Sequence, residues 1–197
     1  MSTLSRPYLT PEQYLEIERK AEFKSEYYQG EMFAMAGAHE AHVTIIFNAV
    51  RELGQQLRRR PCKGYSNHMR VRVTPAGLYT YPDVVVVRGE LQFLDANRDT
   101  LLNPTVIIEV LSESTEADGR GRKFELYRSL ESLTDYLLIS SRWVSAELFT
   151  RQPEGGWLLT AKSSLEDSIE LQSIDCRLLL ADLYEKVEFP QPPSPAL

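Results

Sequence analysis

Two carboxylates stand on apolar stretches that are typical of buried strands. Asp83 is followed by four valines, and Glu109 lies between Ile108 and Val110 in a second apolar stretch. Such runs indicate central strands that are buried on both faces. Burying an ionised carboxylate is unfavourable unless something compensates its charge. Two acids on neighbouring strands could share one hard divalent cation such as Mg²⁺. Alternatively, each acid caps a turn or pairs with a nearby arginine.

These acids belong to an ordered set of motifs. Pro82-Asp83, followed by Glu109 on a later apolar strand, is similar to the PD-(D/E)xK signature of restriction-endonuclease-like nucleases. Together the motifs resemble a large bacterial family of endonucleases long catalogued as a domain of unknown function, the Uma-type family, over about residues 9–187. In chain order the set is SEYYQGE at 25–31, His42, Pro82-Asp83, IEVLSEST at 108–115 and KFELYR at 123–128.

The resemblance implies a metal site with surrounding catalytic side chains. Asp83, Glu109 and the backbone carbonyl of Val110 would hold Mg²⁺ or Mn²⁺. Glu26 would complete this shell or hold a second ion, and His42 would contact the phosphate. Taken without the resemblance, Glu26 is a surface carboxylate and His42 a hydrogen-bonded residue at the edge of the core.

The usual lysine of the motif is missing. Its position, two residues after Glu109, holds Leu111, which can neither donate a proton nor stabilise charge. The replacement candidate is Lys123, on a helix expected after the loop 112–121, where it shares a helix face with Tyr127. Some nucleases of this fold shift the lysine in this way, and the resemblance implies the same shift here. Taken alone, Lys123 is a solvated helix residue.

The first elements carry Glu26. Thr10 and Gln13 form the pattern of a capping box, with proline at the first helical position, so a short helix is expected to begin here. Residues 25–28 and 31–36 flank a Gln-Gly pair and predict a β-hairpin with a tight turn. This hairpin would present Glu26 to the rest of the fold.

A longer helix is expected over about residues 39–60, because Pro61 prevents its continuation. His42 flanks the apolar stripe of this helix and so faces the expected site. The stripe, which predicts the buried face, consists of Val43, Ile46, Phe47, Val50, Leu53 and Leu57.

Basic residues gather after this helix begins. Between residues 51 and 72 there are seven bases and one acid. Such a run is either a solvated polar face or a contact surface for nucleic acid. The candidates for guiding DNA phosphates are Arg58, Arg59, Arg60 and Lys63.

The later part of the chain predicts an antiparallel β extension, with strands at residues 135–140, 142–150, 157–162 and 168–172 and a closing helix at 178–186. The expected fold class is α/β, with a mixed central β-sheet flanked by helices and this extension, and the resemblance implies that this fold is restriction-endonuclease-like. One such domain is expected over residues 9–188, between a flexible N-terminus (1–8) and a Pro-rich flexible tail (189–197).

Composition narrows the function. At 197 residues, 43% apolar and 25% charged, the chain has the size and balance of one globular domain. It has neither a membrane-length apolar run nor a signal pattern, so we expect no membrane association and a cytoplasmic protein. The net charge of −6 argues against a nucleic-acid coat protein but suits an enzyme that meets DNA transiently.

We therefore interpret the sequence as that of a metal-dependent endonuclease that hydrolyses phosphodiester bonds in DNA. The alternative is a catalytically inactive protein with a nuclease fold that acts in binding or assembly, which Leu111 favours. A homodimer is expected in the first case, because cleaving a duplex requires two scissions and two-fold dimers are common.

Overall fold

The computed structural model describes residues 8–35, 37–73, 77–113, 116 and 119–189, and the structural statements below concern these residues. Most of the expected N-terminus and nearly all of the expected C-terminal tail fall outside them. In the N-terminal part the elements are α1 (Pro11–Glu18), β1 (Ser25–Tyr28), β2 (Glu31–Ala34), α2 (Glu40–Leu57), β3 (Cys62–Ser66), β4 (Arg70–Val73), β5 (Leu78–Thr80) and β6 (Val84–Arg88). Then come β7 (Thr100–Leu101), β8 (Val106–Leu111), a π-helical turn (Gly119–Lys123), α4 (Phe124–Tyr127), β9 (Asp135–Ser140), β10 (Ala146–Arg151), β11 (Trp157–Lys162), β12 (Ser168–Leu171), a 3₁₀ turn (Gln172–Ile174), β13 (Cys176–Leu179) and α5 (Leu180–Leu183).

The central sheet is mixed, as the sequence predicts. Its six described strands run in the order β11-β10-β9-β8-β6-β3. Strand β8 pairs antiparallel with β6 on one side and parallel with β9 on the other. The expected antiparallel extension is β9, β10 and β11, which continue this sheet outward.

A second sheet, in the order β2-β1-β5-β4-β7, carries the predicted hairpin. The hairpin turn at Gln29 and Gly30 has both residues at positive φ (45° and 92°), as a tight two-residue turn requires. The chain passes from this sheet to the central one between β5 and β6, through Tyr81, Pro82 and Asp83. The Pro-Asp motif therefore lies at the junction of the two sheets.

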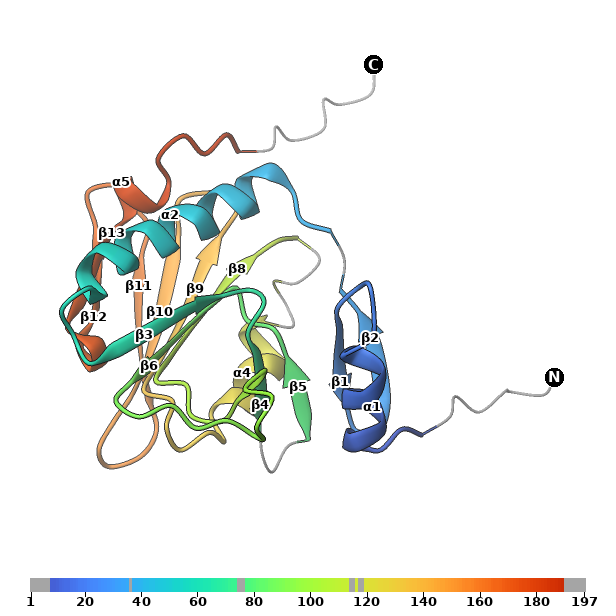
Figure 1. Ribbon diagram of the computed structural model, residues 1–197. Helices are drawn as coiled ribbons and strands as arrows, with labels where there is room; N and C mark the ends of the chain where they lie inside the picture. The colour runs from blue at the N-terminus through green and yellow to red at the C-terminus, as the bar shows by residue number, and fades with distance from the viewer. Residues whose placement is uncertain (1–7, 36, 74–76, 114–115, 117–118, 190–197) are drawn as a thin grey trace, which may run out of the picture.

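The central sheet lies between two covering layers (Figure 1). Helix α2 crosses one face and, with α5 and the β12–β13 ribbon, encloses the larger apolar core. The short helix α4 and the second sheet cover the other face. Helix α1 packs against β1 and β5 through Tyr14, Tyr27 and Tyr79. Its predicted capping box is confirmed, with the Thr10 side chain and the Gln13 side chain each bonded to the other's backbone.

The predicted buried face of α2 is partly wrong. Ile46, Leu53 and Leu57 are buried, but three members of the predicted stripe face solvent. Val43, Phe47 and Val50 are 53%, 67% and 37% exposed. The side that packs on the core also carries Ile45, the small residues Ala41 and Ala49, and the buried Asn48, whose amide donates to the carbonyls of Leu183 and Glu185.

Within the described part of the chain, no helix is both long and apolar enough to cross a membrane.

Candidate active site between the two sheets

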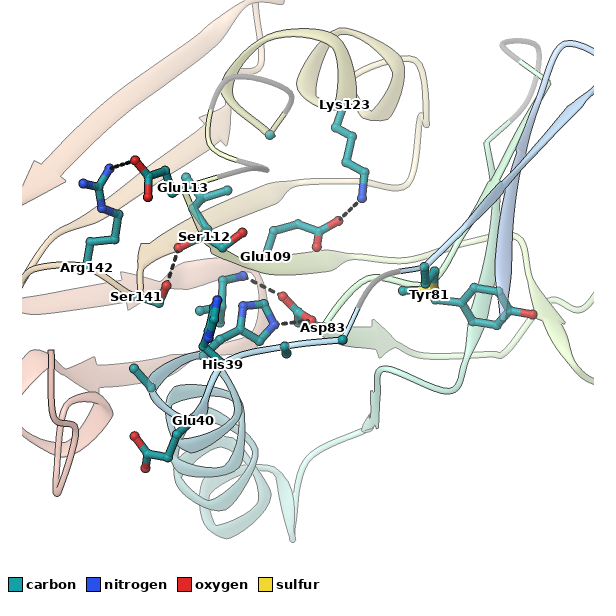
Figure 2. Close-up of a pocket in the computed structure, with 18 of the residues that line it drawn as sticks. His39, Glu40, Tyr81, Asp83, Glu109, Ser112, Glu113, Lys123, Ser141 and Arg142 are labelled. Carbon is teal, nitrogen blue, oxygen red and sulfur yellow. Dashed lines mark hydrogen bonds and ion pairs between the residues drawn. The ribbon is translucent and has the colours of Figure 1, made fainter. Parts of the chain in front are cut away.

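A cavity of about 840 Å³ opens where the two sheets meet. Its walls come from the end of β8, the start of α2, the end of β2 and the Asp83 segment. Figure 2 shows Lys123 reaching from its helical turn toward Glu109, with Asp83 on the α2 side of Glu109. All five predicted catalytic residues line this one cavity: Asp83, Glu109, Lys123, Glu26 and His42.

Asp83 is held from two directions by its neighbours. Because Val84 pairs with Ile108, Asp83 lies beside the next part of β8, where its Oδ2 accepts a 2.7 Å hydrogen bond from the N–H of Val110. Its Oδ1 lies 3.3 Å from Nε2 of His42, in the first turn of α2. These contacts fix the orientation of the carboxylate at the cavity wall.

Glu109 is the most buried acid of the site, with 7% exposure. It shares a face of β8 with Ile107 and Leu111, as strand alternation predicts. The hydroxyl of Tyr127 donates a 2.8 Å hydrogen bond to its Oε1. Burial raises the pKa of Glu109 to about 7, and the nearby charges of Asp83 and Glu26 raise this pKa too, while Lys123 and the Tyr127 hydrogen bond lower it.

Lys123 bridges the two sheets. Its Nζ lies 2.9 Å from Oε1 of Glu26, on β1 of the second sheet, and 3.6 Å from Oε1 of Glu109, on β8 of the central sheet. The same Oε1 of Glu26 accepts a hydrogen bond from the Thr80 hydroxyl at the end of β5. The predicted migrated lysine thus lies beside Glu109, one acid of the predicted pair, and is carried by the last position of the π-helical turn.

Comparison with known proteins identifies the family of this chain. Residues 11–180 match the family Uma2, described as "Putative restriction endonuclease". The chain belongs to this family. Two uncharacterized proteins of Synechocystis sp. are similar to it. One is 32% identical over 188 residues, which covers 93% of this chain and 95% of the relative; the other is 36% identical over 152 residues, covering 77% and 86%.

The fold is also seen in a crystal structure from Anabaena variabilis, described as a putative nuclease belonging to DUF820. It matches this chain with a TM-score of 0.72 at 17% sequence identity and covers 89% of this chain and 97% of that one. At this identity the likeness concerns the fold. It confirms the nuclease-like α/β architecture that the sequence predicts for this Uma2-family chain.

The donor chemistry of the site in this Uma2-family chain suits a hard divalent cation. Asp83 and Glu109 both offer carboxylate oxygens to the cavity. Burial first, and then the charges of Asp83 and Glu26, raise the pKa of Glu109, and a bound cation would offset both effects. Val110 turns its N–H toward Asp83, and the carbonyl of a strand residue points to the same side as its N–H. Among the described residues, no three His, Cys, Asp or Glu side chains form a metal cluster by themselves. Backbone, water and phosphate oxygens would therefore complete the shell, as is usual for Mg²⁺.

The predicted phosphate-guiding bases lie away from this cavity. Arg58 follows α2 sixteen residues after His42, which corresponds to about 24 Å along the helix. Arg58, Arg59 and Lys63 are exposed there. Arg60 donates to the carbonyl of Ile174 and so supports the C-terminal segment. Their contact with nucleic acid stays a prediction, for a surface outside the cleft.

One contributor to the site was not predicted: Thr80, which supports Glu26. Tyr127, expected on the same helix face as Lys123, donates to Glu109. Thr80 stands three residues before Asp83, at the end of a strand too short to give a periodic signal. Tyr127 shares a helix face with Lys123, which was the available signal; its acceptor depends on how α4 packs.

Proposed function

We propose that this chain is a metal-dependent endonuclease that meets DNA transiently in the cytoplasm and hydrolyses its phosphodiester bonds. Family membership supports nuclease activity in general. The observation that carries the proposal is the convergence of Asp83, Glu109 and Lys123 in one cavity although Leu111 occupies the usual lysine position. Such a set pairs cation-binding carboxylates with a positive charge for a phosphate.

The role of the acid pair is to hold Mg²⁺ or Mn²⁺, together with the Val110 carbonyl. When bound, such a cation supplies Lewis acidity toward the phosphate and the attacking water. His42 orients Asp83 and is close enough to the cavity to contact the substrate phosphate. Tyr127 holds Glu109 with its hydroxyl; burial raises the pKa of Tyr127 well above its ordinary value, so this hydroxyl keeps its proton at neutral pH.

Lys123 supplies the positive charge at the reacting phosphate. Its ammonium would orient the water and stabilise charge that develops on the phosphate oxygens. In its neutral form, the amine would accept the proton of the attacking water. Glu26 fixes the ammonium, and Thr80 fixes Glu26. A preorganised charge of this kind needs little rearrangement during the reaction, which is where electrostatic catalysis gains most.

The test combines metal binding with cleavage. Calorimetry should detect Mg²⁺ or Mn²⁺ binding to the wild type and not to Asp83→Asn. Cleavage of plasmid, single-stranded and branched DNA in Mn²⁺ should require the same aspartate. Unchanged metal affinity in Asp83→Asn would refute the assignment of Asp83 to the metal site. Metal binding without cleavage of any substrate would favour the inactive binding or assembly protein.

We also propose that a second copy of the chain covers the exposed stripe of α2. Val43, Phe47 and Val50 lie on consecutive turns of its solvent side. Gly54 continues this side, and a β-carbon there would meet nothing within 4 Å. A glycine inside a helix costs about 0.5–1 kcal/mol relative to alanine, and nothing around Gly54 requires it. The absence of a side chain at Gly54 would let a partner helix approach closely. A two-fold pairing of the two helices would be self-complementary.

A further inference from the structure

A second, smaller pocket of about 190 Å³ opens beside Lys123. It shares Glu26, Phe33 and Lys123 with the large cavity, so the two adjoin at the lysine. Asp83 and Glu109 line the large cavity and not the small one. A substrate whose phosphate lies at Lys123 would therefore extend its neighbouring nucleotide toward this pocket.

The walls of the small pocket are aromatic and aliphatic, with one planar cation. The guanidinium of Arg122 lies over the ring of Tyr28, with its central carbon 4.3 Å from the ring centroid. Phe33, on β2, is 40% exposed. Leu78 and Leu126 complete the apolar part. Flat aromatic rings and Arg guanidinium planes are the surfaces on which proteins stack unpaired bases.

From these features we infer that the small pocket binds one unpaired nucleobase of the strand being cut, next to the scissile phosphate. This inference rests on the proposed nuclease function and assigns the substrate class to it. A pocket of 190 Å³ is smaller than the roughly 300–1,000 Å³ that whole drug-sized ligands occupy, so it suits a single ring system.

A base fits this pocket better than a second phosphate does. Glu26 lies in its wall, and its carboxylate would repel an anion. Lys123, held by Glu26 at 2.9 Å, serves the scissile phosphate in the proposed mechanism and does not supply a second phosphate site. Arg122 lies over the Tyr28 ring. The surface it offers for recognition is therefore the plane of its guanidinium and not a set of converging hydrogen-bond donors.

The substrate class follows from the need to expose a base. In a duplex each base is paired and stacked, and taking one out costs a few kcal/mol. Single strands, flaps and forks present unstacked bases without this cost. The enzyme is therefore a nuclease that cuts at single-stranded or locally unpaired positions in preference to intact duplex.

The experiment measures binding and cleavage separately. Anisotropy with a labelled single-stranded oligonucleotide, and with the same strand in a duplex, is recorded in EDTA for the wild type and for Arg122→Gln, Arg122→Lys and Tyr28→Leu. Arg128→Gln is the matched control, since Arg128 is exposed on the same helical segment and lines neither pocket. Losing one stacked base should weaken single-strand binding about 5- to 100-fold in the three pocket variants, and not in the control. A series of strands with one abasic residue, moved along the sequence, locates the bound base: one position should weaken binding to the wild type, and this penalty should vanish in Tyr28→Leu.

Arg122→Lys separates stacking from charge. It keeps the positive charge and loses the plane, so full binding by this variant would mean that the pocket holds a phosphate and would overturn the inference. An abasic penalty of the same size in the wild type and in Tyr28→Leu would overturn it as well, while Mn²⁺-dependent cleavage by the wild type would leave the proposed function standing. Absence of cleavage and of binding for every nucleic acid would refute both.

Discussion

The side chain of Leu111 occupies the space that a β-carbon on Gly119 would need. An ideal β-carbon at Gly119 would lie 2.5 Å from Cδ2 of Leu111. Leu111 stands where the motif usually carries its lysine, and Gly119 begins the π-helical turn that ends at Lys123. The glycine lets this turn lie closely over β8, so the missing lysine and its replacement are linked by direct packing.

Gly119→Ala should therefore disturb both stability and activity. Leu111 is 4% exposed and packed in the core, so it has little room to move. We expect a loss of about 1–3 kcal/mol in the free energy of unfolding, as for other overpacked sites. Turnover should fall as well, because the turn carries Lys123. Urea titration and cleavage rates provide the measurement. Gly121→Ala in the same turn is the control, since a β-carbon there meets nothing within 4 Å; equal effects of the two substitutions would contradict the packing argument.

Glu109→Gln should change how stability depends on pH. The folded-state pKa of Glu109, about 7, lies above its ordinary value of 4.5, so the folded protein binds this proton more tightly than the unfolded chain does. The stabilisation is complete below pH 4.5 and is lost as the pH rises through 7. Without metal, Glu109→Gln should thus match the wild type near pH 4 and exceed it at pH 8 by on the order of 1–3 kcal/mol. Urea titrations in EDTA measure this difference. Mn²⁺ should then stabilise the wild type and not the variant. Parallel curves of unfolding free energy against pH would argue against a raised pKa at Glu109.

Lys123→Ala and Lys123→Met should keep metal affinity and lose turnover. Lysine is not a ligand of Mg²⁺, and acid–base or charge-stabilising roles are worth roughly 10²- to 10⁴-fold in rate. Lys123→Arg should rescue poorly, because a guanidinium keeps its proton and has a different shape. Calorimetry and Mn²⁺-dependent cleavage give the two readouts. Undiminished cleavage by Lys123→Ala would refute the migrated-lysine mechanism.

Phe47→Glu should convert a dimer to a monomer without loss of fold. The side chain is 67% exposed, so the substitution removes little internal packing and its melting temperature should stay close to that of the wild type. Analytical ultracentrifugation measures the change. The matched control is Phe23→Glu, at a phenylalanine that is 79% exposed outside α2. A wild-type monomer, or a dimer that survives in Phe47→Glu, would exclude the α2 contact.

Removing the charges of Arg58, Arg59 and Lys63 tests the distant basic surface. Arg60 is left in place, because its bond to the Ile174 carbonyl supports the fold. If these bases guide phosphates, the triple alanine variant should bind all DNA sequences about equally less well, and the dependence of log affinity on log salt should flatten by about one unit per lost contact. Unchanged affinity and slope would identify an ordinary solvated helix end.

Local signals in the sequence predicted their elements well. The capping box at Thr10, the Gln29-Gly30 turn and the face shared by Ile107, Glu109 and Leu111 depend on neighbours within a few positions, and the structure contains all three. Strand β13, by contrast, was not predicted; it is short, pairs with β12 among the described strands, and overlaps the start of the expected closing helix, of which α5 forms a later part.

The orientation of α2 shows why periodicity failed there. The predicted stripe includes Phe47, which is exposed, whereas the side that packs carries Ile45 together with Ala41 and Ala49, whose small size gives a weak signal. Asn48 adds a buried amide whose partners are near α5, 135 and 137 residues later. In the site, the approach of Glu26 to Lys123 likewise depends on the packing of the second sheet, which no local pattern encodes.

Lys123 touches one carboxylate from each sheet, Glu26 from one and Glu109 from the other. The geometry of the site consequently depends on how the two sheets are aligned, because a shift of one sheet against the other changes both of these distances. Glu26 depends on a short hairpin near the start of the chain, while Glu109 is embedded in the larger sheet. Heating that frays the hairpin will break the contact between Glu26 and Lys123 first. Thermal inactivation is therefore expected at a lower temperature than the melting of the central sheet.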